Sequence, residues 1–356
     1  MLHILLTFDY ELFFGKNFKK PDEVLFQPAE RIAEILYRHN VSGVFFADTC
    51  SVAAHKRYGL DDYVSKFEKQ ISYLSQVGHD VQLHIHPHWE KTTFEKGDWI
   101  FPENWYRIHD FGFNEDGAIS IIKDGISFLK NTLLPINPNY QCIAYRAGGY
   151  CIQPYDELIE VLYNEGIRID SSICMYKDNV VPARFYDYTK LPSALNWWLT
   201  PGVDIKDSFI NNPNGKALFE VPVGYYHQRL IDRILLLNKV YYKHGAPLGE
   251  AMPTIGANSE TDDGFITKLL TYDKQFQHLS LDSMSAELAY LAIKKLYKIS
   301  QANTYDVYVA FVSHPKVFTG EAYDNLERFV NLIQQSSYYM DFASTIDINH
   351  TLSRFE

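Results

Sequence analysis

The sequence predicts an α/β protein that folds as one barrel-like (β/α) domain. Strand-like apolar segments alternate with amphipathic segments of helical period along most of the 356 residues, the pattern of parallel strands joined by crossover helices. About seven strand and helix pairs can be counted, which favours a barrel over a doubly wound open sheet. Polar residues also gather at the carboxyl ends of the strand-like segments, where a barrel places its chemistry.

The alternation is most regular in the first half of the chain. Pro28 suits the first turn of a helix, and Gly78 suits the end of one. Residue ranges in chain order are strand 2–8, helix 28–40, strand 41–48, helix 61–79, strand 80–86, helix 117–133, strand 141–148, helix 153–166 and strand 167–173.

Residues from about 176 to 280 break this rhythm. Aromatic, Asn and Pro clusters surround an isolated strand over 217–226, which indicates a loop-rich insertion or subdomain within the single domain of residues 1–356. The alternation then returns with helix 285–300, strand 306–314, helix 321–334 and a final strand near 340–346.

Composition excludes some classes of function. A formal net charge of -11 opposes binding to nucleic acid, because affinity for phosphates comes from clustered Lys and Arg. No run of about 18 apolar residues occurs, so we expect no membrane-spanning helix. The four cysteines form no CxxC pair and are too sparse for a disulfide framework, and the first residues do not read as an export signal. Both observations favour a cytoplasmic location.

Two acids follow the first strand. The alternation of side chains along a strand puts Asp9 and Glu11 on one side, with Tyr10 on the other. Two carboxylates in one small space are costly without a cation or a proton between them. The pair therefore predicts either a metal ion or a strongly raised pKa.

Three histidines and a tryptophan follow the third strand, in the sequence LHIHPHW at residues 83–89. Two pairs of histidines could bind one metal ion, His84 with His86 or His84 with His88. If the strand ends near His84 and the chain turns at Pro87, His84 and His88 converge on one ion, at about 2.0 to 2.1 Å for zinc. His86 then lies behind the ligands or faces the substrate.

Further strand ends carry Arg146, Asp170 and His314. An arginine there can hold a carboxylate in one rotamer and keep it ionised. A histidine paired with Asp170 could be kept protonated for acid catalysis. Gly148 and Gly149 let the backbone approach a neighbour closely.

Five segments occur in a fixed order: TFDYE (7–11), GHDVQLHIHPH (78–88), YRAGGY (145–150), IDSSI (169–173) and VSH (312–314). In this order they resemble the five motifs of the NodB-type polysaccharide deacetylases, also called family-four carbohydrate esterases. Any one motif is weak, whereas the ordered set is specific. The resemblance runs from residue 4 to about 315, with 176–300 outside any motif, and it implies a distorted (β/α)7 barrel.

Carried over by position, the resemblance implies a catalytic base at Asp9, oriented by Arg146. It implies metal ligands at His84 and His88, and an acid at His314 tuned by Asp170. The family's first motif is usually TFDDG, and Tyr10 stands where its metal-binding acid would be, so the alternation along the strand favours Glu11 as third ligand. We expect His86, Trp89 and Tyr150 at the substrate.

The implied reaction is metal-dependent hydrolysis of an N-acyl group, most simply N-acetyl, from an amino sugar in a saccharide or precursor of surface-glycan biosynthesis. Two imidazoles and one carboxylate favour zinc, with cobalt, nickel, iron or manganese as alternatives. The altered motifs leave two rival functions open. One is a metal-independent, allantoinase-like hydrolase of cyclic amides or ureides, and the other is a carbohydrate-binding relative without catalysis.

Overall fold

The structure is a computed structural model. It describes residues 1–15, 18–104, 106–174, 180–181, 186–213, 215–227, 276–303, 305–318 and 320–353. Of the expected insertion at 176–280, the residues between 228 and 275 lie outside the described part.

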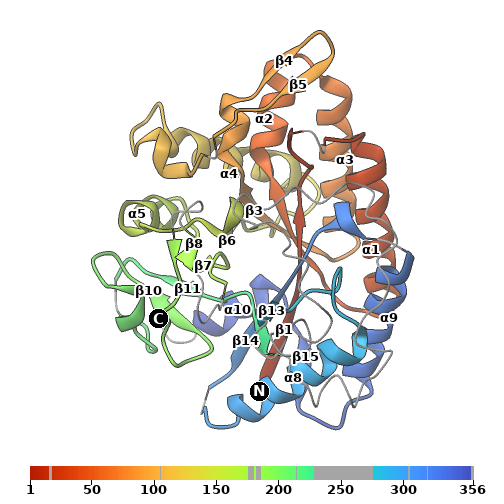
Figure 1. Ribbon diagram of the computed structural model, residues 1–356, viewed down its shortest axis with the longest axis vertical. Coiled ribbons are helices and arrows are strands. Elements are labelled where there is room, and N and C mark those ends of the chain that lie inside the picture. Colours follow the sequence, from red (N-terminus) through yellow and green to blue (C-terminus); the bar gives the residue numbers. More distant parts are fainter. Residues whose placement is uncertain are drawn as a thin grey trace, which may run out of the picture.

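Seven parallel strands form the core of the described chain (Figure 1). Neighbouring strands pair in the order β14, β1, β2, β3, β6, β7, β11, and β10 extends the sheet in the antiparallel direction beside β11. The register is longest between β1 and β14, where Leu2 pairs with Val307 and Phe8 with Ser313. The bounds are β1 Leu2–Tyr10, β2 Val44–Asp48, β3 Asp80–Ile85, β6 Ala144–Ala147, β7 Ile169–Asp170, β10 Trp197–Leu199, β11 Leu218–Glu220 and β14 Val307–Ser313.

The two ends of this sheet meet through the residues that follow β11. Val223 bridges Cys174, beyond β7, on one side and Ala310 of β14 on the other. The Gly224 amide donates to the Ala310 carbonyl at 2.9 Å, so β11 and its extension close the ring. Closure by isolated bridges rather than by a full strand makes this a distorted (β/α) barrel, as the sequence predicted.

Helices cover the outside of the barrel, and Figure 1 shows α1 and α9 running along the same flank. Their apolar stripes face the strands, as Ile32, Ala33 and Leu36 of α1 do. The bounds are α1 Gln27–Arg38, α2 Thr49–Arg57, α3 Asp61–Gln76, α4 Ala118–Leu133, α5 Asp156–Asn164, α8 Ala286–Ser300, α9 Gly320–Gln334 and α10 Thr345–Leu352.

Short strands complete the described architecture. The hairpin β4–β5 lies at the end of the molecule opposite the N-terminus (Figure 1), and β15 pairs with the start of β1. Their bounds are β4 Thr93–Glu95, β5 Asp98–Ile100, β8 Val180–Val181, β9 Tyr186–Asp187, β12 Tyr225–His227, β13 Phe276–His278 and β15 Met340–Phe342.

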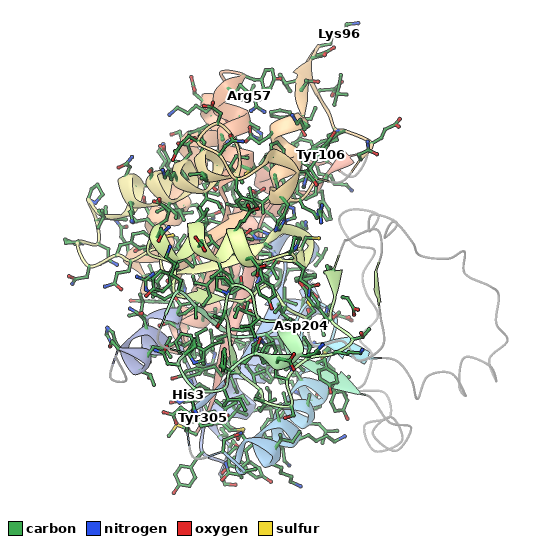
Figure 2. All side chains as sticks on the ribbon, turned by 90° about the vertical axis from the view of Figure 1, so that its left-hand side faces the viewer. His3, Arg57, Lys96, Tyr106, Asp204 and Tyr305 are labelled. Carbon is green, nitrogen blue, oxygen red and sulfur yellow. The ribbon has the colours of Figure 1, made fainter. Side chains whose placement is uncertain are left out.

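One face of the strands carries apolar side chains first and polar site residues nearer the carboxyl ends. Leu5, Val44 and Phe46 are buried in one cluster on this face, and Asp9 lies on the same side of β1 as Leu5 because side chains alternate. The strands start at the far end of the molecule. Figure 2 shows His3 and Tyr305, next to the starts of β1 and β14, opposite Arg57 and Lys96.

None of the helices in the described ranges is long and apolar enough to cross a lipid bilayer.

Candidate metal centre

Asp9 and Arg146 form a buried ion pair at the carboxyl ends of β1 and β6. The Nη1 atom of Arg146 donates to Asp9 Oδ1 at 2.5 Å and to Thr7 Oγ1 at 2.7 Å. Two further bonds, from Nε to the Ser171 carbonyl and from Nη2 to Ser171 Oγ, are both 2.8 Å long and fix the guanidinium plane. Burial raises the pKa of Asp9, but the charges of Arg146, His84 and His314 together outweigh it and hold that pKa below its usual value. Asp9 is therefore ionised and fixed in one orientation.

Glu11, His84 and His86 bring three potential ligand atoms together. One atom from each residue lies within 4.8 Å of the others, and all three residues are buried. The Nε2 atom of His84 is 3.3 Å from Glu11 Oε2, and His86 Nε2 contacts the same oxygen. Burial raises the pKa of Glu11, but the charges of His86 and Lys316 lower it well below its usual value.

The hydrogen bonds of His84 decide which of its nitrogens faces Glu11. Its Nδ1 lies 2.8 Å from the backbone carbonyl of Arg146. Since a carbonyl oxygen only accepts, Nδ1 carries the proton, and Nε2 points toward Glu11. A ligating histidine is usually held in this way, with its other nitrogen donating to a carbonyl or carboxylate. Two imidazoles and a carboxylate in this arrangement fit a divalent metal ion such as zinc.

His86 is held from two sides. Its amide lies 3.3 Å from Asp48 Oδ1, at the end of β2. Gly148 lies against its ring, where a Cβ atom would come within 2.6 Å of His86 Nδ1 and of the Ile85 carbonyl oxygen. Glycine at 148 is thus required for the imidazole to approach the turn after β6.

His88 lies outside this group, contrary to the pairing of His84 with His88 in the sequence analysis. The extended backbone continues to His86, at φ -109° and ψ 88°, before Pro87 starts a 3-10 turn over Pro87–Lys91. Side-chain alternation therefore puts His84 and His86, two residues apart, on one side. The turn carries His88 against the Phe14 ring, with ring centroids 4.0 Å apart, and burial lowers the pKa of His88 well below its usual value.

His314 faces both acids from the end of β14. Its Nε2 lies 3.6 Å from Asp9 Oδ2 and 3.8 Å from Glu11 Oε1. Its Nδ1 lies 3.3 Å from Asp282 Oδ2, and its backbone amide donates to the same oxygen at 2.8 Å. Burial lowers the pKa of His314, but the hydrogen bond with Asp282 and the charge of Asp9 raise it above the usual value.

Asp170 is not the partner of His314. Its carboxylate accepts from Ser172 Oγ at 2.7 Å and from the Ser172 amide at 3.0 Å. On the next strand, Glu220 pairs with Asp170 in the register of β7 and β11, and the Glu220 carboxyl is completely buried. Asp170 thus belongs to a separate hydrogen-bonded group. Asp282, and not Asp170 as expected from the sequence, lies beside His314.

Lys316 is a functional candidate that the sequence analysis missed. Its Nζ donates to Glu11 Oε1 at 2.6 Å and to the Leu12 carbonyl at 3.3 Å. The acid pair was expected to need a metal ion or a strongly raised pKa. The structure does not show the raised pKa, because Arg146 lies beside Asp9 and Lys316 beside Glu11, and the pKa of each acid is lowered.

The two aromatic residues expected at the substrate, Trp89 and Tyr150, differ in their exposure to solvent. Trp89 is fully buried, with its ring against Phe14 and Trp99, so no face is exposed for a sugar. Tyr150 is half-buried and has a positive φ of 63°. His86, the third residue expected at the substrate, lies among the potential metal ligands instead.

The protein is therefore a (β/α)-barrel protein with a candidate divalent-metal centre at the mouth of the barrel.

No family model matches the chain, and no curated protein matches it significantly. Among solved structures, the chain is similar to one from Mycobacterium smegmatis assigned as a polysaccharide deacetylase, at 13% identity and a TM-score of 0.49, covering 99% of this chain and 91% of that one.

Two further solved structures are similar to it. One from Pseudomonas aeruginosa PAO1, assigned as a polysaccharide deacetylase, has 13% identity and a TM-score of 0.48, covering 99% of this chain and 90% of that one. The Puue allantoinase has 12% identity and a TM-score of 0.47, covering 98% of this chain and 88% of that one. At these identities, the chemistry of the site has to be argued from its own residues.

Proposed function

We propose that the protein is a hydrolase that removes an N-acyl group, most simply N-acetyl, from an amino sugar, with the help of a divalent metal ion. One observation supports this proposal: three groups of residues lie together at the carboxyl ends of the strands. Glu11, His84 and His86 converge, Asp9 is held ionised by Arg146, and His314 faces both acids.

Glu11, His84 and His86 are the residues that would hold the ion, and zinc is the first choice. When bound, the ion polarises the acyl carbonyl and makes a water molecule more acidic. Asp9 is suited to take the proton from that water, because Arg146 occupies its Oδ1 and leaves Oδ2 directed toward His314. The base is therefore oriented before substrate arrives.

His314 is suited to protonate the departing amine. Its Nδ1 contacts Asp282, so Nε2 is the atom that points into the site and carries the transferable proton. Its raised pKa keeps it protonated nearer to neutral pH. Each of the two proton transfers contributes roughly 10² to 10⁴ in rate.

The proposed substrate is an N-acylated amino sugar in a saccharide or sugar precursor of surface-glycan biosynthesis. The ordered motifs support this class, as does the description of two similar solved structures as polysaccharide deacetylases. We place the reaction in the cytoplasm, because all four cysteines are buried thiols outside any disulfide. Localisation of the protein by cell fractionation tests this placement.

The contact between Lys316 and Glu11 favours a second candidate, a metal-independent hydrolase of cyclic amides or ureides. The ammonium group of Lys316, 2.6 Å from Glu11, already places a positive charge in this centre. In such an enzyme, Lys316 would take over the charge that a metal ion otherwise supplies.

Elemental analysis and an amine-release assay separate the two candidates. The purified protein is assayed with N-acetylglucosamine oligosaccharides and nucleotide sugars, before and after a chelator, and with cyclic ureides. We expect about one divalent ion per chain, loss of amine release with the chelator and recovery with zinc. Ureide hydrolysis without bound metal would instead support the second candidate.

The Asp9→Asn variant gives the sharpest mutational test. We expect a loss of roughly 10² to 10⁴ in kcat with the fold intact, since asparagine keeps the shape but cannot accept the proton. The control is Asp62→Asn, whose side chain is 84% exposed on α3. Unchanged turnover in Asp9→Asn would contradict both hydrolase candidates.

A further inference from the structure

Lys316 lies inside the metal centre although none of the five sequence motifs includes it. It follows His314 by two residues, at the 3-10 turn Pro315–Val317 after β14. Only 12% of its side chain is exposed, and its Nζ is 2.6 Å from Glu11 Oε1. Its charge therefore acts on Glu11 with little screening by water.

Glu11 divides its two oxygens between different partners. The imidazoles of His84 and His86 contact Oε2, while Lys316 donates to Oε1. A divalent ion bound by Glu11, His84 and His86 would share this carboxylate with an ammonium of the same sign of charge. Binding of the ion must then weaken or break the contact between Lys316 and Glu11.

The ammonium has other partners close by once Glu11 is taken. The ring centroids of Phe13 and Phe14 lie 5.3 and 5.4 Å from Nζ, within the range of a cation–π interaction. The carbonyl of Leu12 lies 3.3 Å from Nζ. Lys316 can therefore leave Glu11 without losing every favourable contact.

We propose that Lys316 is a built-in competitor of the divalent ion for Glu11. It neutralises Glu11 when the ion is absent, and it is displaced toward the Phe13 and Phe14 rings when the ion binds. The centre consequently holds its ion more weakly than its three ligands alone would allow. This inference rests on the proposed metal-dependent function and adds control of ion occupancy to it.

Zinc titration of the metal-free protein tests the proposal without an activity assay. Dissociation constants are measured by calorimetry, with a competing chelator where binding is tight, for wild type, Lys316→Met and Lys316→Gln. We expect both variants to bind zinc at least about tenfold more tightly, because the competing charge is removed. The control is Lys66→Met, a 41% exposed lysine paired with Asp22 and Asp62, which should leave the affinity unchanged.

Thermal unfolding gives a second readout. In chelator, Lys316→Met should have a lower Tm than wild type, since Glu11 loses its ammonium partner. Zinc should then raise the Tm of Lys316→Met by more than it raises the Tm of wild type. An equal rise in both proteins would overturn the competition.

The results distinguish the inference from the function on which it rests. Wild-type zinc binding with equal or weaker binding by both Lys316 variants sinks the inference and leaves the metal centre standing. Absence of zinc binding in wild type and variants overturns both. If neither variant folds, a zinc-soaked crystal of wild type decides: an Nζ that remains hydrogen-bonded to Glu11 beside a bound ion refutes the competition.

Discussion

Two buried polar regions lie at the barrel mouth, and they differ in what their polar atoms face. On the β1–β3 side, Asp9, Glu11 and His84 turn their charged atoms toward one another across a short gap. On the β7–β11 side, Asp170 is satisfied by Ser172, with the buried Glu220 as its neighbour. We call the first region the acid centre and the second the support layer.

The difference indicates which region does chemistry and which holds it in place. Polar atoms of the support layer make hydrogen bonds within the protein, as when Ser171 Oγ donates to the Val221 carbonyl at 2.8 Å and Asp170 accepts from Ser172. The acid centre gathers carboxylates and imidazoles around shared oxygens, which suits a cation or a moving proton. Arg146 belongs to both, because its guanidinium contacts Asp9 and Ser171 together.

The largest expected effect comes from breaking this link. Arg146→Met should lower the free energy of unfolding by about 3 to 5 kcal/mol, because the carboxylate of Asp9 is left buried without its cation. Urea denaturation measures the loss. Arg168→Met is the control, since Arg168, just before β7, donates to the carbonyls of Tyr163 and Ile167 in a half-buried position, and its loss should cost about 1 kcal/mol. Equal losses in the two variants would remove the distinction between the regions.

A smaller effect should separate Asp282 from Asp170. Asp282→Asn should lower kcat roughly 10- to 100-fold, as loss of an orienting partner of a functional histidine does. Because Asp282 raises the pKa of His314, the alkaline limit of the pH–rate profile should move to lower pH in this variant.

Asp170→Asn should leave that alkaline limit in place, because its carboxylate bonds to Ser172 rather than to His314. Its effect should fall on the free energy of unfolding instead. A shifted limit in Asp170→Asn, with none in Asp282→Asn, would restore the assignment made from sequence.

The smallest effect is expected at Glu220. Burial and the nearby Asp170 raise the pKa of Glu220 well above its usual 4.5. An acid with a raised pKa in the folded state stabilises that state at low pH, and this stabilisation is lost as pH rises. Wild type should therefore lose stability relative to Glu220→Gln as the pH rises above 4.5, the usual pKa of a glutamate, and urea denaturation at several pH values measures this difference. A constant difference would mean that folding does not raise this pKa.

Much of the fold followed from local pattern. The runs 2–8 and 41–48 gave the first two strands because buried parallel strands are rich in apolar residues. The run 80–86 gave the third because its apolar residues alternate with polar ones. Asp9, Glu11, Arg146 and His314 were identifiable for a related reason: each follows or ends such a run, and parallel strands bring their carboxyl ends to one edge. The contacts of Asp9 with Arg146 and His314 lie where that rule predicts.

The remaining features depend on contacts between distant segments. Asp282 lies in a turn without period or motif. It reaches His314 through hydrogen bonds to β14, from the Leu281 amide to Ser313 Oγ at 3.0 Å and from the Val312 amide to the Leu279 carbonyl at 2.9 Å. The choice between His86 and His88 depended on whether the strand stops at His84 or continues, which Pro87 alone does not decide. Lys316 did carry a local signal, a lysine two residues beyond a strand-end histidine.

The bridges at Val223 close the barrel through far fewer paired residues than join β1 and β14. Seven paired residues join β1 to β14, whereas an isolated bridge joins Val223 to Ala310. At Gly224, in that joint, a Cβ atom would come within 2.7 Å of Leu279 Cδ1 and 2.8 Å of Val309 Cγ1. The Gly224 carbonyl accepts from the Leu279 amide at 2.9 Å, three residues before Asp282. Loosening of this joint would therefore act on the segment that carries Asp282, the partner of His314.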